Sequence, residues 1–168
     1  MTGDGCARRI HLEGRVQGVG YRPFVLRLAL RLGVKGWVQN LGGSVAIQAE
    51  GSPERLAEFV SALRAEAPPM ARPDPPVVEQ IQTEGCVDFR IRDSAGDAVS
   101  QIVIPPDHGL CDDCLAELSD PADRRYRYPF THCTQCGPRY TLIDRVPYDR
   151  PNTAMAVFPL CSACQAPM

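Results

Sequence analysis

The most constraining feature of this chain is a short glycine loop between a predicted strand and a predicted helix. Its sequence is Arg15-Val16-Gln17-Gly18-Val19-Gly20-Tyr21-Arg22. Two glycines after a strand, with an arginine at a helix start, allow successive backbone N–H groups and a guanidinium to surround one tetrahedral anion. The sequence therefore predicts a phosphate-binding loop, made by Gln17, Gly18, Val19, Gly20, Tyr21 and Arg22.

Other interpretations of the loop are open at this point. The glycines could serve only to make a tight turn between strand and helix. A nucleotide is disfavoured, because the stretch lacks the Lys-Ser/Thr of a P-loop and the Gly-x-Gly-x-x-Gly order of a dinucleotide site. Asn40 favours a phosphoryl ligand, since its carboxamide on a neighbouring strand could hold and orient a water beside it; the alternative is a turn residue before Gly42-Gly43.

Hydrophobic periodicity places the loop in a βαββαβ order. We expect an α+β fold of the ferredoxin-like type, an antiparallel sheet with both helices on one face. Prolines from Pro68 to Pro76 exclude a helix there. The predicted strands are residues 7–16, 34–41, 44–49, 77–83 and a short 89–91, and the predicted helices are about 22–32 and 52–65.

Composition limits the classes of function. A chain of 168 residues with 44% hydrophobic residues can build a core, and 18 basic against 20 acidic side chains give a net charge of -2. No global basic surface for nucleic acid follows from such a balance. No apolar run is long enough for a membrane span, and the N-terminus has no leader-like pattern, so we expect a cytoplasmic protein without a membrane partner.

Six of the eight cysteines form three C-x-x-C pairs in the last third of the chain. The first two pairs have the spacing C-x2-C-x18-C-x2-C, which predicts one tetrahedral structural zinc site. Redox chemistry at the pairs is the alternative, and either His108 or His132 could replace a thiolate. The predicted zinc ligands are Cys111, Cys114, Cys133 and Cys136.

The third pair, Cys161 and Cys164, has no fourth pair after it, so it can supply only an incomplete second metal site. Cys6 and Cys86 are isolated and are expected to be ordinary thiols. The predicted organisation is a sandwich domain at 8–93, a linker at 94–108, a small loop-rich zinc finger with four cysteine ligands at 109–140, and the start of a second, incomplete finger at 141–168.

The glycine loop and the later stretch Gly36-Trp37-Val38-Gln39-Asn40 resemble the two signatures of acylphosphatases. The resemblance covers residues 8 to about 92 in the expected order of elements. It implies that the loop and Arg22 bind phosphate and that Asn40 orients the attacking water. Hydrolysis of an acyl phosphate agrees with this, because it needs positioning and charge stabilisation more than a covalent nucleophile.

The region from Pro105 to Tyr140, with its first two cysteine pairs, resembles the first zinc finger of HypF-type carbamoyltransferases, and residues 144–164 resemble the start of the second. The resemblance implies the N-terminal portion of a [NiFe] hydrogenase maturation factor that uses carbamoyl phosphate. Its implied partners are the downstream domains of that protein and other maturation proteins. The adenylation and carbamoyl-transfer domains of that family are missing from this sequence.

Three functional hypotheses follow. The first is an enzyme that hydrolyses carbamoyl phosphate or another acyl phosphate at Arg22 and Asn40. The second is a non-catalytic module that binds phosphate and uses its zinc region for protein interactions. The third, nucleic-acid binding by the basic and aromatic run from Arg124 to Tyr128, is disfavoured against a solvated stretch between zinc knuckles.

Overall fold

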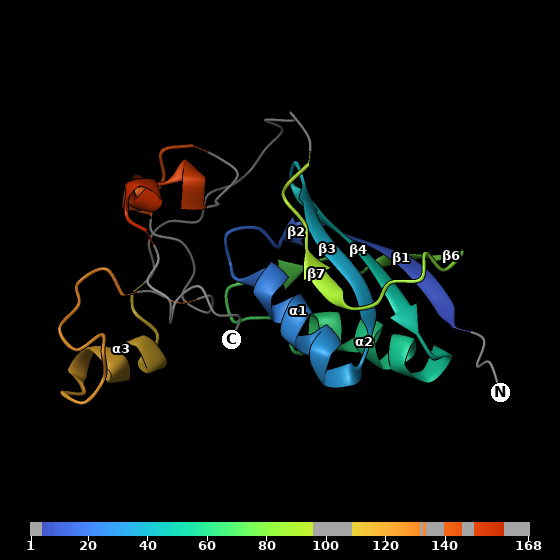
Figure 1. Cartoon of the computed structure of the whole chain (residues 1–168), viewed down its shortest axis with the longest axis horizontal. Helices are drawn as coiled ribbons and strands as arrows, with labels where there is room; N and C mark the ends of the chain where they lie inside the picture. The colour runs from blue at the N-terminus through green and yellow to red at the C-terminus, as the bar shows by residue number, and fades with distance from the viewer. Residues whose placement is uncertain (1–4, 96–108, 132, 134–139, 146–149, 160–168) are drawn as a thin grey trace.

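The computed structural model of this chain describes residues 5–95, 109–131, 133, 140–145 and 150–159. Its N-terminal half is a two-layer sandwich in which α1 and α2 cover the same face of one sheet (Figure 1). The sheet has the order β6-β1-β4-β3-β7, with antiparallel neighbours except for β7, which runs parallel to β3. This arrangement confirms the predicted ferredoxin-like βαββαβ fold. The elements are β1 (Cys6–Leu12), α1 (Tyr21–Leu32), β3 (Lys35–Leu41), β4 (Ser44–Gly51), α2 (Pro53–Ala65), β6 (Val77–Ile81) and β7 (Phe89–Ile91).

Local sequence accounts for the limits of both helices. α1 ends at Gly33, whose left-handed conformation lets its N–H reach the carbonyls of Ala29 and Leu30. α2 begins after Ser52, whose side chain accepts a hydrogen bond from the Arg55 N–H at 3.4 Å, and Pro53 occupies its first position. The helices therefore start and stop within two residues of the predicted limits.

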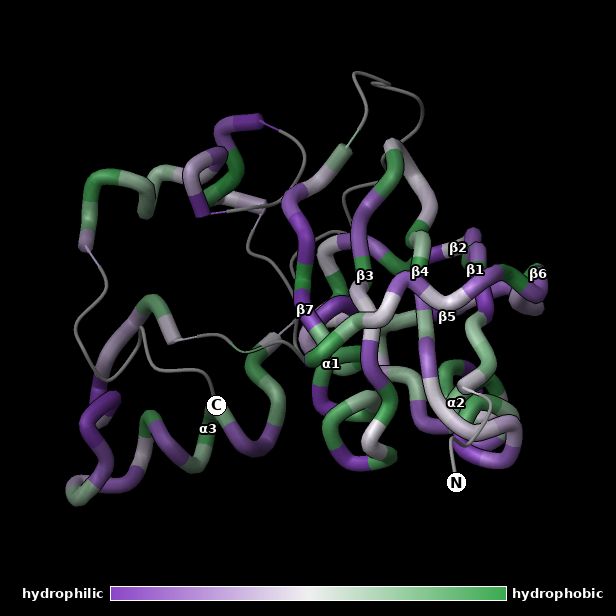
Figure 2. Tube along the Cα trace, turned by 45° about the vertical axis from the view of Figure 1, so that its right-hand side comes forward, coloured by the Kyte–Doolittle hydropathy of each residue, from purple (hydrophilic) through white to green (hydrophobic). Residues whose placement is uncertain are grey.

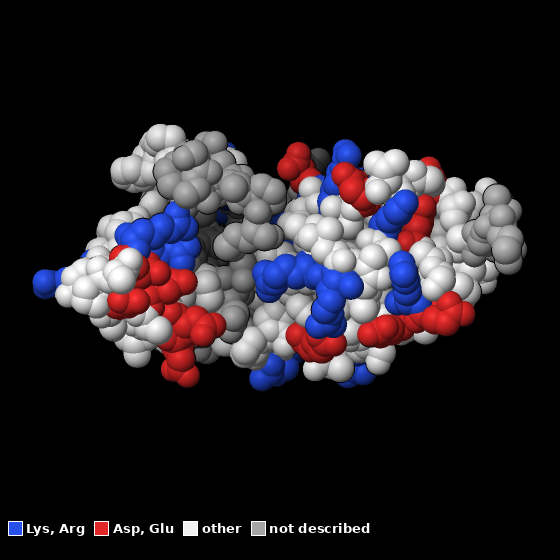
Figure 3. Space-filling view, turned by 60° about the horizontal axis from the view of Figure 1, so that its bottom comes forward, with Lys and Arg blue, Asp and Glu red and all other residues white. Residues whose placement is uncertain are grey.

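The core lies between the sheet and the two helices. Ile10, Val38 and Ile47 point from the strands toward Val25 of α1 and Phe59 of α2, and all five are buried. Figure 2 shows hydrophilic residues interspersed with apolar ones along both helices, as expected for helices with one solvent face. The exposed helical side carries basic and acidic side chains side by side, without a field of one sign (Figure 3).

The structure corrects the prediction in three places. The strand predicted at 7–16 is broken, because β1 ends at Leu12 and a separate strand begins at Gly14, whose φ is 89°. The short strand β2 (Gly14–Arg15) pairs with β5 (Arg72–Pro73) and forms a second, two-stranded sheet. The proline-rich sequence around β5 does not predict this sheet. The sheet is also not wholly antiparallel, since β7 joins β3 in the parallel sense.

The described C-terminal residues contain one α-helix, α3 (Asp112–Ser119), and three short 3-10 helices at Tyr140–Leu142, Arg150–Asn152 and Ala154–Val157. They lie to one side of the sandwich (Figure 1). The sequence does not predict helix α3, but the region is loop-rich as expected. His108, His132, Cys136, Cys161 and Cys164 lie outside the described residues. None of the helices described is both long enough and apolar enough to cross a bilayer.

Candidate anion site and cysteine cluster

The glycine loop joins β2 to α1 through two left-handed residues. Gly18 has φ 66° and Gly20 has φ 72°, a region that only glycine enters at little cost. The side chains of Val16 and Val19 are buried and hold the loop against the core. The Gln17 side chain donates to the Ser44 carbonyl at 3.0 Å, which ties the loop to the start of β4. The loop is therefore held by apolar contacts with the core and by this hydrogen bond.

The start of α1 is suited to an anion because its N-cap residue offers no side-chain acceptor for the free backbone N–H groups of the first turn. Gly20 is the N-cap residue and offers no side-chain hydrogen bond, and the first turn of the helix contains no acidic residue. The first N–H groups of a helix lack intrahelical acceptors and carry the positive end of the helix dipole. An anion at this position would therefore meet both donors and a favourable field.

Tyr21 could contribute to an anion site only through its backbone. Its side chain is buried and its hydroxyl donates to the Leu63 carbonyl of α2 at 2.8 Å. Burial raises the pKa of the Tyr21 phenol, so the ring remains a neutral donor. The contact fixes the start of α1 against α2.

Arg22 and Asn40 meet although they come from different elements. The Asn40 carboxamide oxygen accepts from Arg22 Nη2 at 3.2 Å and from Nε at 3.1 Å. We assign the oxygen, and not the amide nitrogen, to this side because the reverse orientation would set donor against donor. Asn40 is buried on β3, so the guanidinium is held at a defined place beside the helix start.

Gly36 and Trp37, which precede Asn40 on β3, have structural roles. A Cβ at Gly36 would lie 1.9 Å from the Gln48 carbonyl oxygen, so only glycine lets β3 approach β4 there. Trp37 lies on the sheet face opposite the buried Val38, with the guanidinium carbons of Arg9 and Arg92 at 5.1 and 4.2 Å from its ring centre. The stretch thus builds the strand that carries Asn40.

Sequence reasoning missed one residue at the site. Arg22 Nη1 donates to the Ser94 hydroxyl at 3.5 Å, the outer limit of a hydrogen bond. Ser94 follows β7 and falls in the segment that the sequence predicts as a linker. No local motif marks it, because its partner lies 72 residues earlier in the chain.

The sequence reasoning also missed a buried carboxylate on the sheet. Glu50, at the end of β4, accepts from the backbone N–H groups of Glu84 at 2.6 Å and Cys86 at 3.0 Å. Burial opposes ionisation of Glu50, but these donors and the Gln48 side chain outweigh it, so the pKa of Glu50 lies below its usual value. This fold therefore already uses backbone N–H groups to hold one anion.

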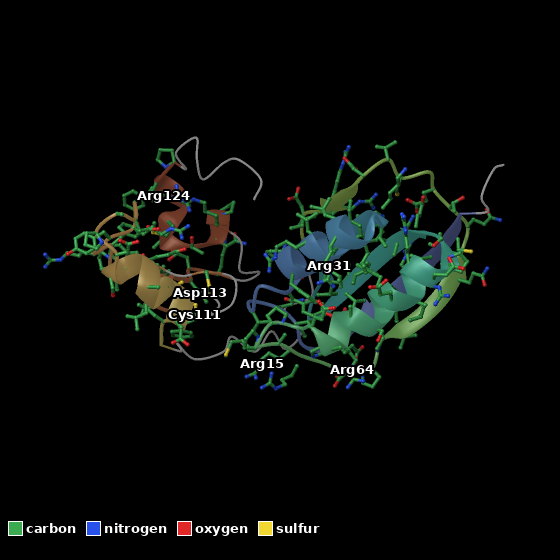
Figure 4. All side chains as sticks on the ribbon, turned by 90° about the horizontal axis from the view of Figure 1, so that it is seen from below. Arg15, Arg31, Arg64, Cys111, Asp113 and Arg124 are labelled. Atoms are coloured by element: carbon green, nitrogen blue, oxygen red, sulfur yellow. The ribbon has the colours of Figure 1, made fainter. Side chains whose placement is uncertain are left out.

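Three of the four predicted zinc ligands converge in the C-terminal region. The sulfur atoms of Cys111, Cys114 and Cys133 all lie within 4.8 Å of one another, and the sulfurs of Cys111 and Cys133 are 3.5 Å apart. Zinc–sulfur bonds of about 2.3 Å in a tetrahedron place sulfurs about 3.8 Å apart. The three thiols therefore fit such an ion. Cys111 and Asp113 lie at the start of α3, on the side of the molecule away from Arg64 of α2 (Figure 4).

Comparison with known proteins identifies both the sandwich and the region of the first cysteine pairs. Residues 8–91 match the family model of acylphosphatase. The acylphosphatase of Thermotoga petrophila is 46% identical over 87 residues, which cover 51% of this chain and 96% of that protein. This chain belongs to the acylphosphatase family. Residues 110–143 match the model of the HypF finger, so this acylphosphatase domain is followed by a second known module.

The two modules occur together in HypF carbamoyltransferases. The carbamoyltransferase HypF2 of Cupriavidus necator is 53% identical over 160 residues, covering 91% of this chain and 19% of that protein. A crystal structure of full-length HypF in its phosphate- and nucleotide-bound form superposes with a TM-score of 0.85 at 41% identity, covering 96% of this chain and 21% of the other. This chain spans about a fifth of the length of these relatives. The predicted resemblance to HypF is thus confirmed.

Proposed function

We propose that this chain hydrolyses acyl phosphates, and that carbamoyl phosphate is its substrate. The observation that carries the proposal is the pairing of Arg22 with Asn40 beside a helix start that has no side-chain cap. In this assignment the backbone N–H groups of residues 17–22 and the Arg22 guanidinium bind the phosphoryl oxygens. Asn40 orients the water that attacks phosphorus.

The chemistry needs little beyond these groups. Water forms a new oxygen–phosphorus bond while the bond between phosphorus and the acyl oxygen breaks, and that oxygen leaves with the electron pair as a carboxylate, or as carbamate from carbamoyl phosphate. The proton of the water passes to the phosphate or to solvent. Negative charge on the phosphoryl oxygens is stabilised by fixed donors, which is the main requirement of phosphoryl transfer. Asn40 would have to exchange part of its contact with Arg22 for the substrate and the water.

We further propose that the chain acts as the N-terminal portion of a HypF-type carbamoyltransferase in [NiFe] hydrogenase maturation. The domain pair and the similarity over 91% of the chain support this context. The HypF structure with phosphate supports a phosphate ligand within that protein as a whole. The partners in this proposal are the remaining domains of the full-length protein and other maturation proteins. The cysteine cluster would hold a structural zinc, with Cys136 as the fourth ligand.

Phosphate release from carbamoyl phosphate and from acetyl phosphate tests the activity. Arg22→Ala is expected to lower kcat/KM by about 100- to 1,000-fold, the range found when one donor to a developing charge is removed. Asn40→Ala should lower kcat by about 100-fold with a smaller change in KM. The control is Arg27→Ala, an exposed residue of the same helix, which should stay within about twofold of the parent. Undiminished turnover in both site variants would refute the proposal.

A second candidate is a phosphate-binding module without useful turnover. The existing contact between Arg22 and Asn40 favours it, because the carboxamide oxygen would have to give up part of this contact before it could orient a water. Calorimetric titration with inorganic phosphate separates the two. Binding that depends on Arg22, together with hydrolysis no faster than that of the Arg22→Ala variant, would support the module over the enzyme.

A further inference from the structure

The segment after β7 continues along β3 as if it belonged to the sheet. The Arg92 N–H donates to the Val38 carbonyl at 2.9 Å, and the Ala95 N–H donates to the Asn40 carbonyl at the same distance. Between them the Gln39 side chain donates to the Asp93 carbonyl at 2.7 Å. Residues 92–95 are therefore held along the strand that carries Asn40, with a shift of one residue in the pairing between Arg92 and Ala95.

This backbone pairing brings the Ser94 hydroxyl to the guanidinium of Arg22. Nη1 of Arg22 contacts Ser94 Oγ at 3.5 Å, while Nε and Nη2 contact the Asn40 carboxamide oxygen at 3.1 and 3.2 Å. The arginine of α1 is thus held from two sides by groups that both depend on β3, one within the strand and one hydrogen-bonded along its edge. Arg22 is only partly exposed.

We propose that Ser94 is a positioning residue of the phosphate site, acting through Arg22. An arginine side chain has several rotatable bonds, and ordering it on ligand binding costs conformational entropy. A guanidinium already held at Nη1 by Ser94 loses less of this freedom when it meets the phosphoryl oxygens. The inference rests on the proposed function of the loop, and adds a residue outside both signature stretches.

Binding and kinetics on the full chain test this role. Ser94→Ala is expected to raise both the dissociation constant for inorganic phosphate and the KM for acyl phosphate by about three- to tenfold, with kcat within about twofold, because the contact is made equally in the ground and transition states. Ser94→Thr keeps the hydroxyl and should restore values within about twofold of the parent. Ser61→Ala, an exposed serine of α2, is the matched control and should change nothing.

A spectroscopic readout keeps this test separate from that of the proposed function. The NMR signal of the Arg22 Nε–H, assigned by its loss in Arg22→Lys, should exchange with solvent several-fold faster in Ser94→Ala than in Ser61→Ala or the parent. If the parent neither binds phosphate nor hydrolyses acyl phosphates, the proposed function fails, whereas the exchange rate still decides whether Ser94 orders Arg22. An unchanged exchange rate, or unchanged phosphate affinity in a parent that binds phosphate, would overturn the role of Ser94.

Discussion

The two helices of the sandwich lie on the same face of the sheet, yet they begin in opposite ways. α2 starts from an extended Ser52 whose side chain caps the helix, and Glu54 adds a carboxylate to its first turn. α1 starts from a left-handed Gly20 without a side-chain cap, and its first turn carries Arg22 and no acid. A helix that needs only stability satisfies its N–H groups with its own residues. A helix that leaves its first N–H groups for an incoming anion cannot have such a side-chain cap.

A third helix start extends the comparison. The N-cap residue of α3 is Cys111, and Asp112 and Asp113 add two carboxylates to its first turn. The three thiol groups gathered there suit a cation rather than an anion. The sandwich also has a core of its own, whereas most large apolar side chains in the α3 region are exposed. The start of α1 therefore fits a phosphate, that of α2 needs no ligand, and that of α3 fits a metal.

The largest expected effect tests the start of α3. We predict one tightly bound zinc per chain, whose removal by a chelator takes away a binding free energy on the order of 10 kcal/mol and unfolds the region of α3. The sandwich should keep its structure, because its core does not depend on the cysteines. Metal analysis and NMR spectra with and without chelator measure this. Cys114→Ala should lose the metal and the control Cys86→Ala should retain it; a metal-free protein with α3 intact would contradict the prediction.

The next effect tests the left-handed start of α1. Gly20→Ala is expected to lower the free energy of unfolding by about 1–2 kcal/mol, because an alanine at φ 72° adopts a conformation unfavourable for L-residues. At α2, Ser52→Gly should cost only a few tenths of a kcal/mol, since glycine is an acceptable N-cap. Urea denaturation measures both. Equal losses at the two helix starts would remove the contrast between them.

A smaller effect tests the missing acid in the first turn of α1. Pro23→Glu places a carboxylate there, as Glu54 does in α2, and should raise the KM for acyl phosphate by about five- to tenfold through repulsion of the phosphoryl group. Added salt should reduce this increase, because salt screens the repulsion. Pro23→Gln removes the same ring without adding charge and serves as the control. A glutamine variant as impaired as the glutamate variant would show that shape, and not charge, is responsible.

The smallest effect concerns Glu50, the anion that the fold already holds with backbone N–H groups. Since its pKa is lowered on folding, its stabilising contribution is complete above the unfolded pKa, near 4.3 for glutamate, and is lost as the pH falls through the lower folded value. Glu50→Gln should therefore lose less stability than the parent between about pH 5 and pH 3. Urea denaturation at several pH values measures this, with the exposed Glu58→Gln as control. Parallel pH profiles for the parent and Glu50→Gln would refute it.

The parts of the fold that the sequence predicts best are those specified by neighbouring residues. The apolar spacing of α1, the Ser52-Pro53 start of α2 and the turn at Gly42-Gly43 each act over a few residues, and the structure places all three as expected. The failures involve partners far apart in the chain. The pairing of β2 with β5 and the parallel addition of β7 to β3 depend on contacts that no local pattern encodes.

The same division holds at the site. Two short motifs are enough to propose Arg22 and Asn40 as site residues, because the glycine loop and the strand each have a local signature. The cysteine spacing likewise predicts a metal cluster, and three of its members converge. No sequence motif identifies Ser94 or Glu50, because the role of each depends on which backbone and side-chain groups contact it in the fold.

By itself, then, the sequence determined the order of elements, the glycine loop and the cysteine spacing, since periodicity, glycine conformation and ligand spacing are local properties. Only the tertiary structure decided that the Arg22 guanidinium meets the Asn40 carboxamide, that Ser94 reaches the same guanidinium, and that Glu50 is held by the N–H groups of Glu84 and Cys86. Those contacts depend on which strands pair and in which register, and register is fixed by the packing of the whole sheet against its helices.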